Sequence, residues 1–184
     1  PRFTLATSSL LGAVLVYLSF LLVRRVATPG VAALSAFLVV VGGQALYFTA
    51  MNPSYSHIHD AVAVALLVYA VLRARMEPDR YRFWIWAGVL VGVAVLQRLS
   101  NVAFGLLPLW SILELSRGSS IRTSLRRAML LLPGIVLGSV PLLVSYKYMF
   151  GKYIFFTHGR HFLHMAHAHP ILLLFDQRGG LFLF

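Results

Sequence analysis

The 184-residue chain contains no cysteine, which excludes disulfides, thiolate catalysis and cysteine-ligated zinc. Acidic residues are also scarce, because there are five against sixteen Lys and Arg, and the formal net charge is +11. Only 11% of the residues are charged, whereas a soluble domain keeps roughly a quarter of its residues charged. No stretch matches a P-loop, a dinucleotide fingerprint or a nucleophile elbow. The sequence therefore offers none of the common signatures of a soluble enzyme.

Apolar residues make up 59% of the chain and are grouped in long runs. The first run, residues 4–23, has twenty residues, which at about 1.5 Å per residue matches a hydrocarbon core of about 30 Å. We therefore expect an all-α fold, a polytopic transmembrane helical bundle with about six membrane helices. The expected helices cover residues 4–23, 31–50, 57–72, 83–97, 102–115 and 128–146.

These helices define an expected transmembrane region over residues 1–150. Residues 151–184 are expected to form an external loop, rich in histidine and aromatic residues, that leads into a further membrane segment. Because residue 1 is proline and the chain stops within the apolar run "GGLFLF", we expect it to be a piece of a longer membrane protein.

The basic residues are concentrated in three short segments between apolar runs. Residues 24–29, 73–82 and 117–127 hold two, four and four of the sixteen Lys and Arg. Such clustering in short loops is typical of cytoplasmic loops and argues against nucleic acid as a partner. If residues 83–115 formed one helix about 50 Å long, the last two segments would lie on opposite faces of the membrane. We therefore predict that the chain turns back near Arg98, with both of its ends outside.

Polar residues at the predicted outer membrane boundary are candidates for a functional site, because ionisable groups there are costly and usually face a cavity or a partner. His57, His59 and Asp60 lie at the outer start of the third expected helix. Asp60 is either a capping acid, since the helix macrodipole favours an anion in the first turn, or a carboxylate that faces an external reaction cleft.

Arg98, in "VLQRLSN", is the second candidate. Its side chain either extends to lipid head groups or holds a phosphate, for which the guanidinium fork gives bidentate geometry. Gln97, Ser100 and Asn101 beside it supply neutral donors of the kind that complete a phosphate or sugar site.

The segment "THGRHFLHMAHAHP", residues 157–170, contains five histidines. Helical spacing would let only two or three neighbouring rings share one ion, and Asp176 is the one carboxylate nearby, so a metal site is the least favoured of three interpretations. The segment is either an interfacial polar stretch or a contact surface for an anionic lipid-linked substrate. In the second case Arg160 and His161 are the binding candidates, with Lys152 as a further charge partner.

Gly88 and Gly92 are separated by the four-residue spacing that favours close packing of membrane helices. We interpret this pair as a packing feature.

The order of these features resembles that of the multi-spanning glycosyltransferases of the GT-C superfamily. A helix ends in Arg-Arg, a loop carries "NPSYSHIHD", an aliphatic helix ends in basic residues, and "WAGVLVGVAVLQRLSNVAFGLLPL" follows. The chain is most similar in appearance to the bacterial branch related to protein O-mannosyltransferases and lipid A aminoarabinose transferases. In that branch the pattern reads roughly "aGlllGlalltR/K…n…lPl".

The resemblance implies an enzyme of the cell envelope, in the inner (plasma) membrane, that moves a sugar from a polyprenyl-phosphate donor to an acceptor on the extracytoplasmic face. The family's catalytic aspartate, a general base, would precede residue 1. Asp60 stands where many members have an acid, and Arg98 matches the basic residue of the pattern. Arg98 would neutralise the leaving lipid phosphate. The resemblance leaves open whether the protein needs a divalent cation, since some relatives use one and others do not.

The candidate site therefore has Asp60 as its catalytic residue. The expected substrate-binding residues are Arg98, Asn101, His57, His59, Arg160 and His161. The expected partners are the lipid-linked donor and membrane lipids. A transporter is one alternative, although it needs ionisable groups at mid-membrane or internal repeats, and we find no repeat. A metal-binding membrane protein that uses the histidine-rich tail is the other.

Overall fold

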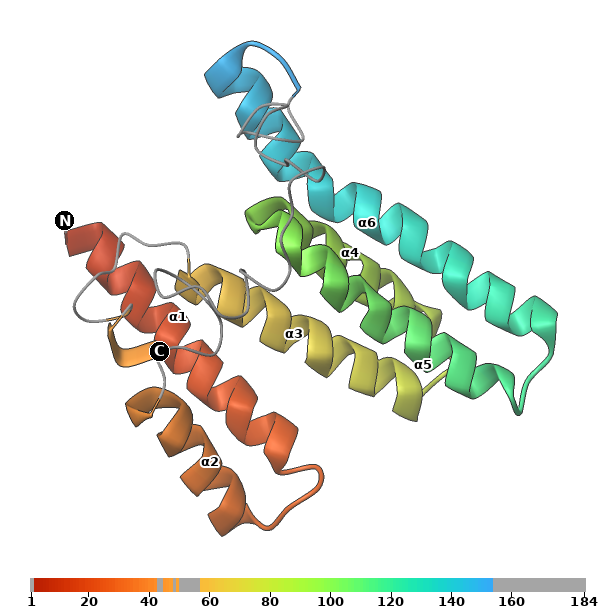
Figure 1. The fold of residues 1–184 in the computed structure, drawn as a ribbon, viewed down its shortest axis with the longest axis horizontal. Helices are drawn as coiled ribbons and strands as arrows, with labels where there is room; N and C mark the ends of the chain where they lie inside the picture. The colour runs from red at the N-terminus through yellow and green to blue at the C-terminus, as the bar shows by residue number, and fades with distance from the viewer. Residues whose placement is uncertain (1, 43–44, 48, 50–56, 154–184) are drawn as a thin grey trace, which may run out of the picture. The chain divides into compact units, whose positions relative to one another are not determined.

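The computed structural model describes residues 2–42, 45–47, 49 and 57–153, and the described chain is helical without any strand (Figure 1). The chain divides into two units, residues 1–145 and 146–184. In the second unit, the Lys147 ammonium donates to the Gly151 carbonyl oxygen at 2.9 Å and lies 5.5 Å from the centre of the Tyr153 ring.

Six α-helices lie where the six helices were expected, which confirms the all-α fold within the described residues. They are α1 (Arg2–Val23), α2 (Pro29–Val41), α3 (His57–Met76), α4 (Tyr81–Gln97), α5 (Leu106–Ser116) and α6 (Ile121–Phe150), with a 3₁₀ helix η2 (Leu99–Gly105) between α4 and α5.

The boundaries differ from the expected ones for local reasons. Helix α2 ends at Val41 rather than at residue 50, because a glycine pair follows. Helix α3 continues to Met76 because the first helix-breaking residue there is Pro78. Helix α6 begins at Ile121 rather than at residue 128, since the Ser120 hydroxyl accepts from the Thr123 N–H at 3.3 Å and caps the helix. Part of the arginine-rich segment 117–127 is therefore helical.

The chain reverses direction between α4 and α5, as predicted. Arg98, at the end of α4, lies 3.6 Å from Asp60 at the start of α3. Glu114, near the end of α5, lies 2.5 Å from Arg75 near the end of α3. Because α3 is next to the end of α4 at one terminus and to the end of α5 at the other, α4 and α5 are antiparallel.

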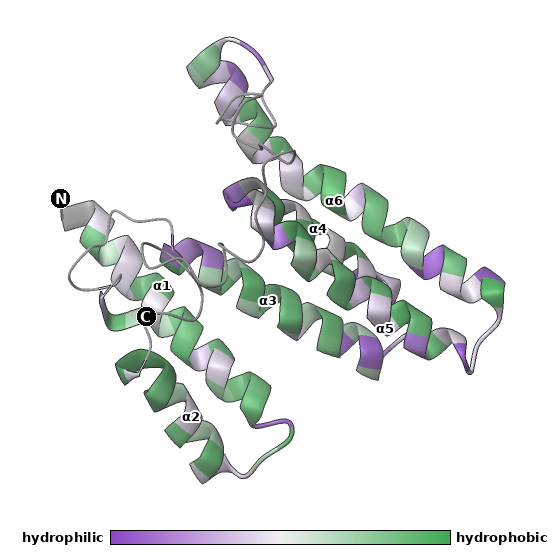
Figure 2. Ribbon diagram, in the orientation of Figure 1, coloured by the Kyte–Doolittle hydropathy of each residue, from purple (hydrophilic) through white to green (hydrophobic). Residues whose placement is uncertain are grey.

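The three arginine-rich segments share one end of the bundle. Arg25, which follows α1, lies 2.7 Å from the sulfur of Met76 at the end of α3. Arg127 of α6 lies 3.6 Å from Asp79 in the turn between α3 and α4. Figure 2 shows hydrophilic residues at the end of α3 and the start of α6, with apolar residues between the ends of the helices. We call this the arginine end, and its make-up agrees with the single basic face that the sequence predicts.

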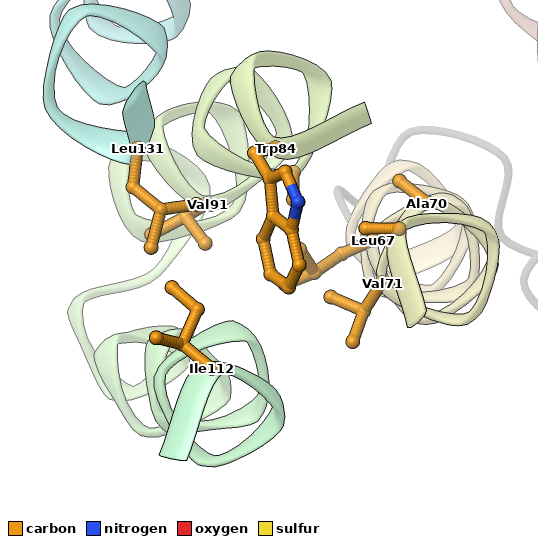
Figure 3. Packing of buried hydrophobic residues seen from close by; sticks show 9 residues of the cluster. Leu67, Ala70, Val71, Trp84, Val91, Ile112 and Leu131 are labelled. Atoms are coloured by element: carbon orange, nitrogen blue, oxygen red, sulfur yellow. The ribbon is translucent and has the colours of Figure 1, made fainter. Parts of the chain in front are cut away.

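A buried apolar cluster holds α3, α4, α5 and α6 together (Figure 3). Trp84 of α4 is fully buried, and its indole lies beside Leu67 and Val71 of α3. The indole N–H donates to the Pro78 carbonyl oxygen at 3.1 Å, so its polar atom is satisfied. The buried members are Leu67, Ala70, Val71, Ala74, Trp84, Ala87, Val91, Ile112 and Leu131.

Three helices are long and apolar enough to cross a membrane: Thr4–Val23, His57–Met76 and Ile121–Phe150. Many large apolar side chains also face outward, among them Leu10, Trp110 and Val136. A soluble monomer rarely exposes so many large apolar side chains, whereas a bilayer solvates them. The described fold is therefore that expected of a membrane protein.

Glycines bring α4 and α6 into close backbone contact. A Cβ added at Gly88 would meet the Leu131 carbonyl oxygen and the Cα of Gly134. A Cβ at Gly92 would lie 3.1 Å from the backbone nitrogen of Ser139 and closer still to a neighbouring carbonyl oxygen. The packing interpretation of the Gly88 and Gly92 pair is thus confirmed.

We predict that Gly88→Ala lowers the free energy of unfolding by about 1–3 kcal/mol, because the added methyl group forces α4 away from α6. Alanine is a better helix former than glycine by about 1 kcal/mol. Any loss of stability in Gly88→Ala would therefore have to come from the contact between α4 and α6. Reversible unfolding of the purified chain in detergent measures the change. Gly30→Ala is the matched control, since that helical glycine has nothing within 4 Å and should gain stability. Equal gains in both variants would contradict the prediction.

Candidate functional site

Four of the predicted site residues meet at the end of the bundle opposite the arginine end. His57 and Asp60 stand three residues apart in the first turn of α3, and this spacing puts them on one face. Arg98 follows α4 in an extended conformation, with φ −148° and ψ 129°. Asn101 lies in η2, where its N–H donates to the Arg98 carbonyl oxygen at 3.0 Å. We call these four residues the Asp60–Arg98 cluster.

Asp60 is engaged through both carboxylate oxygens. Its Oδ2 lies 3.6 Å from Nε of Arg98, and its Oδ1 accepts a short hydrogen bond from the Asn101 amide. The same amide donates to the Ala94 carbonyl oxygen at 2.9 Å, and Asn101 is only 5% exposed. Asp60 therefore joins the start of α3 to the turn that follows α4.

The Arg98 guanidinium contacts His57 and Asp60, and part of it remains exposed. Its Nη2 lies 3.1 Å from Nε2 and 2.5 Å from Nδ1 of His57, while its Nε faces Asp60. Since arginine can only donate, an imidazole nitrogen of His57 is the acceptor in this contact. Nη1 has no partner within the described residues, and 40% of the side chain is exposed, against 16% for Asp60. The outer part of the guanidinium is thus available to an anion.

The other predicted site residues do not join the cluster. His59 is exposed, and nothing in the described part of the chain pairs with its ring. Arg160 and His161 lie outside the described residues, as does the histidine-rich segment. The described ranges hold no group of three or more His, Cys, Asp or Glu residues that could bind a metal ion.

Sequence reasoning missed how the cluster is held. It placed Asn101 beside Arg98 as a neutral donor, but not as the bridge between Asp60 and the Ala94 carbonyl oxygen. A contact across 41 residues leaves no local signal in the sequence. The buried Oε1 of Gln97, which has no partner among the described residues, was also unforeseen.

No family model, curated protein or solved structure matches this chain. The functional interpretation therefore rests on the sequence pattern and on the geometry of the cluster. An open guanidinium, fixed beside a carboxylate and an imidazole at the end of an apolar bundle, is suited to bind a phosphate group.

We predict that Asp60→Asn destabilises the fold by about 1–3 kcal/mol, because the new NH₂ group must face the donor of either Asn101 or Arg98. Thermal unfolding in detergent measures the loss. Glu114→Gln is the control, because it removes a more exposed interhelical ion pair at the other end of α3, which is worth about 0–1 kcal/mol. An Asp60→Asn variant no less stable than the Glu114→Gln variant would argue against a holding role for Asp60.

Proposed function

We propose that this chain belongs to a membrane glycosyltransferase that transfers a sugar from a polyprenyl-phosphate donor to an acceptor on the extracytoplasmic face. The observation that carries the proposal is the Asp60–Arg98 cluster, in which a partly exposed guanidinium is fixed at the rim of apolar helices. The order of sequence features that resembles the GT-C glycosyltransferases supports the same conclusion.

In this proposal Arg98 contacts the phosphate that links the sugar to the lipid. Breaking the bond between the sugar and the phosphate leaves negative charge on the departing lipid phosphate. A guanidinium already aimed at that position stabilises the charge without reorganising. His57 and Asp60 keep the guanidinium in place, and the apolar helices beside it offer a surface for the polyprenyl chain.

Asp60 fits a positioning role better than that of a general base. Its Oδ1 already accepts from Asn101 and its Oδ2 is ion-paired with Arg98, so an acceptor hydroxyl would compete with these two partners for the carboxylate.

The proposed topology has six membrane helices, the arginine end in the cytoplasm and the Asp60–Arg98 cluster outside. The basic segments gathered at one end support it through the positive-inside rule. Helix α4 has 17 residues and spans about 25 Å, so Arg98 would lie slightly inside the outer interface of a core about 30 Å thick.

Single-thiol labelling tests this topology, because the chain has no cysteine of its own. We expect His59→Cys and Ser100→Cys to react with a membrane-impermeant maleimide added outside intact cells, and Ser120→Cys to react only after permeabilisation. All three positions lie at helix ends, and His59 and Ser100 are exposed. If His59→Cys and Ser100→Cys were labelled from opposite sides of the membrane, the proposed topology and the proposed site would both be wrong.

The role of Arg98 is tested by Arg98→Ala in the intact protein, assayed with a lipid-linked sugar. We expect turnover to fall about 10²–10³-fold, the usual effect of removing one group that stabilises developing charge. Arg98→Lys should restore only part of the rate, since an ammonium lacks the guanidinium fork.

Arg75→Ala is the matched control for this assay. It removes an arginine from another interhelical ion pair, at the arginine end, and should leave turnover unchanged. If Arg98→Ala inserted normally and kept full activity, Arg98 could not have the proposed role of stabilising the phosphate.

A further inference from the structure

A hollow of about 460 Å³ lies at the arginine end, between the start of α4 and the first turns of α6. It is separate from the Asp60–Arg98 cluster, which lies at the other end of α4. Its lining combines two arginines with a hydroxyl, a phenol and apolar side chains. The lining residues are Tyr81, Arg122, Thr123, Leu125, Arg126 and Met129.

The two arginines of the hollow carry charge that no carboxylate balances in the described chain. The Arg126 guanidinium lies 4.0 Å from the centre of the Tyr81 ring, which fixes its position, and Arg122 stands one helical turn earlier. The acids at this end are paired with other arginines: Glu77 with Arg73 and Arg80, Glu114 with Arg75, and Asp79 with Arg127. Two positive charges therefore face one recess, where an anion would balance them.

An exposed apolar stripe continues from the hollow along the same face of α6. Its residues follow the spacing of three and four that lines one side of a helix, and each is between 44% and 65% exposed. From Met129 to Val140 the stripe rises about 16 Å, close to half of a hydrocarbon core of about 30 Å. One acyl chain of a single leaflet would match that length. The stripe consists of Leu125, Met129, Leu132, Val136 and Val140.

We propose that this hollow binds the head group of an anionic phospholipid, with its phosphate between Arg122 and Arg126 and an acyl chain along the stripe. Charge-assisted hydrogen bonds from two guanidinium groups favour a phosphate over a neutral head group. A soluble phosphate would use the arginines but not the apolar stripe, which is why a lipid is the better occupant. The site does not depend on the glycosyltransferase proposal, and either can fail without the other.

The test is a titration of the full chain in neutral detergent with phosphatidylglycerol, with bound lipids counted by native mass spectrometry. Each arginine near a membrane surface is worth about fivefold in affinity for an anionic lipid. We therefore expect about fivefold weaker binding for Arg122→Gln and roughly thirtyfold for Arg122→Gln with Arg126→Gln. Phosphatidylcholine with the same acyl chains should bind at least as weakly as phosphatidylglycerol does to the double variant.

The control is a double variant, Arg24→Gln with Arg117→Gln, which removes two exposed arginines outside the hollow and so changes the net charge equally. It should bind phosphatidylglycerol like the unaltered chain, and an equal loss would mean that only overall charge matters. Glycerol phosphate that displaces the lipid at equal concentration would assign the hollow to a soluble phosphate and overturn the proposal. Arg122→Gln keeps the test valid if the double variant misfolds, since nothing in the described residues pairs with Arg122. Unchanged binding by that single variant would also refute the site.

Discussion

Asp60 holds Arg98 with one carboxylate oxygen and Asn101 with the other, and through them it ties the start of α3 to the turn between α4 and α5. Without Asp60, the buried Asn101 amide would keep only the Ala94 carbonyl oxygen, and the Arg98 guanidinium only His57, as partners within the described residues. Polar groups left incompletely satisfied at the edge of an apolar bundle are costly. With the tie in place, α5 returns antiparallel to α4, and Glu114 reaches Arg75. The separation of charge into two ends of the bundle depends on this reversal.

The two ends use charge differently. At the arginine end, ten Arg of the three basic segments meet three acids, so positive charge stays in excess after the ion pairs are formed. In the Asp60–Arg98 cluster at the other end, one arginine meets one carboxylate, and an imidazole lies beside them. An apolar middle section separates the ends, since few charges are tolerated along α1, α2 or the central turns of α4.

The sequence could predict the features that depend on one-dimensional pattern. The positions of the six α-helices follow from apolar runs, and the reversal near Arg98 follows from the placement of arginines. The spacing of Gly88 and Gly92 predicts a close helix contact, although not that α6 is the partner. Contacts that depend on how helices rotate about their axes could not be predicted. The bond from Asn101 to Asp60 and the ring of Tyr81 under Arg126 are of this kind, because each joins residues from separate helices. The start of α6 was placed too late because a run of arginines was read as a loop, although arginine is a good helix former.

The two proposed phosphate sites differ in whether a carboxylate already pairs with the arginine. This difference favours a different kind of ligand at each site. Arg98 already has a carboxylate partner, so a phosphate gains less there than at a bare guanidinium, and a donor lipid can leave after transfer. Catalysis requires such a balance, because binding the ground state as tightly as the transition state adds nothing to turnover. Arg122 and Arg126 have no carboxylate to compete with a ligand, as far as the chain is described, and would retain a lipid that stays in place. A substrate site at one end of α4 and a structural lipid at the other are therefore the roles that these two distributions of charge favour.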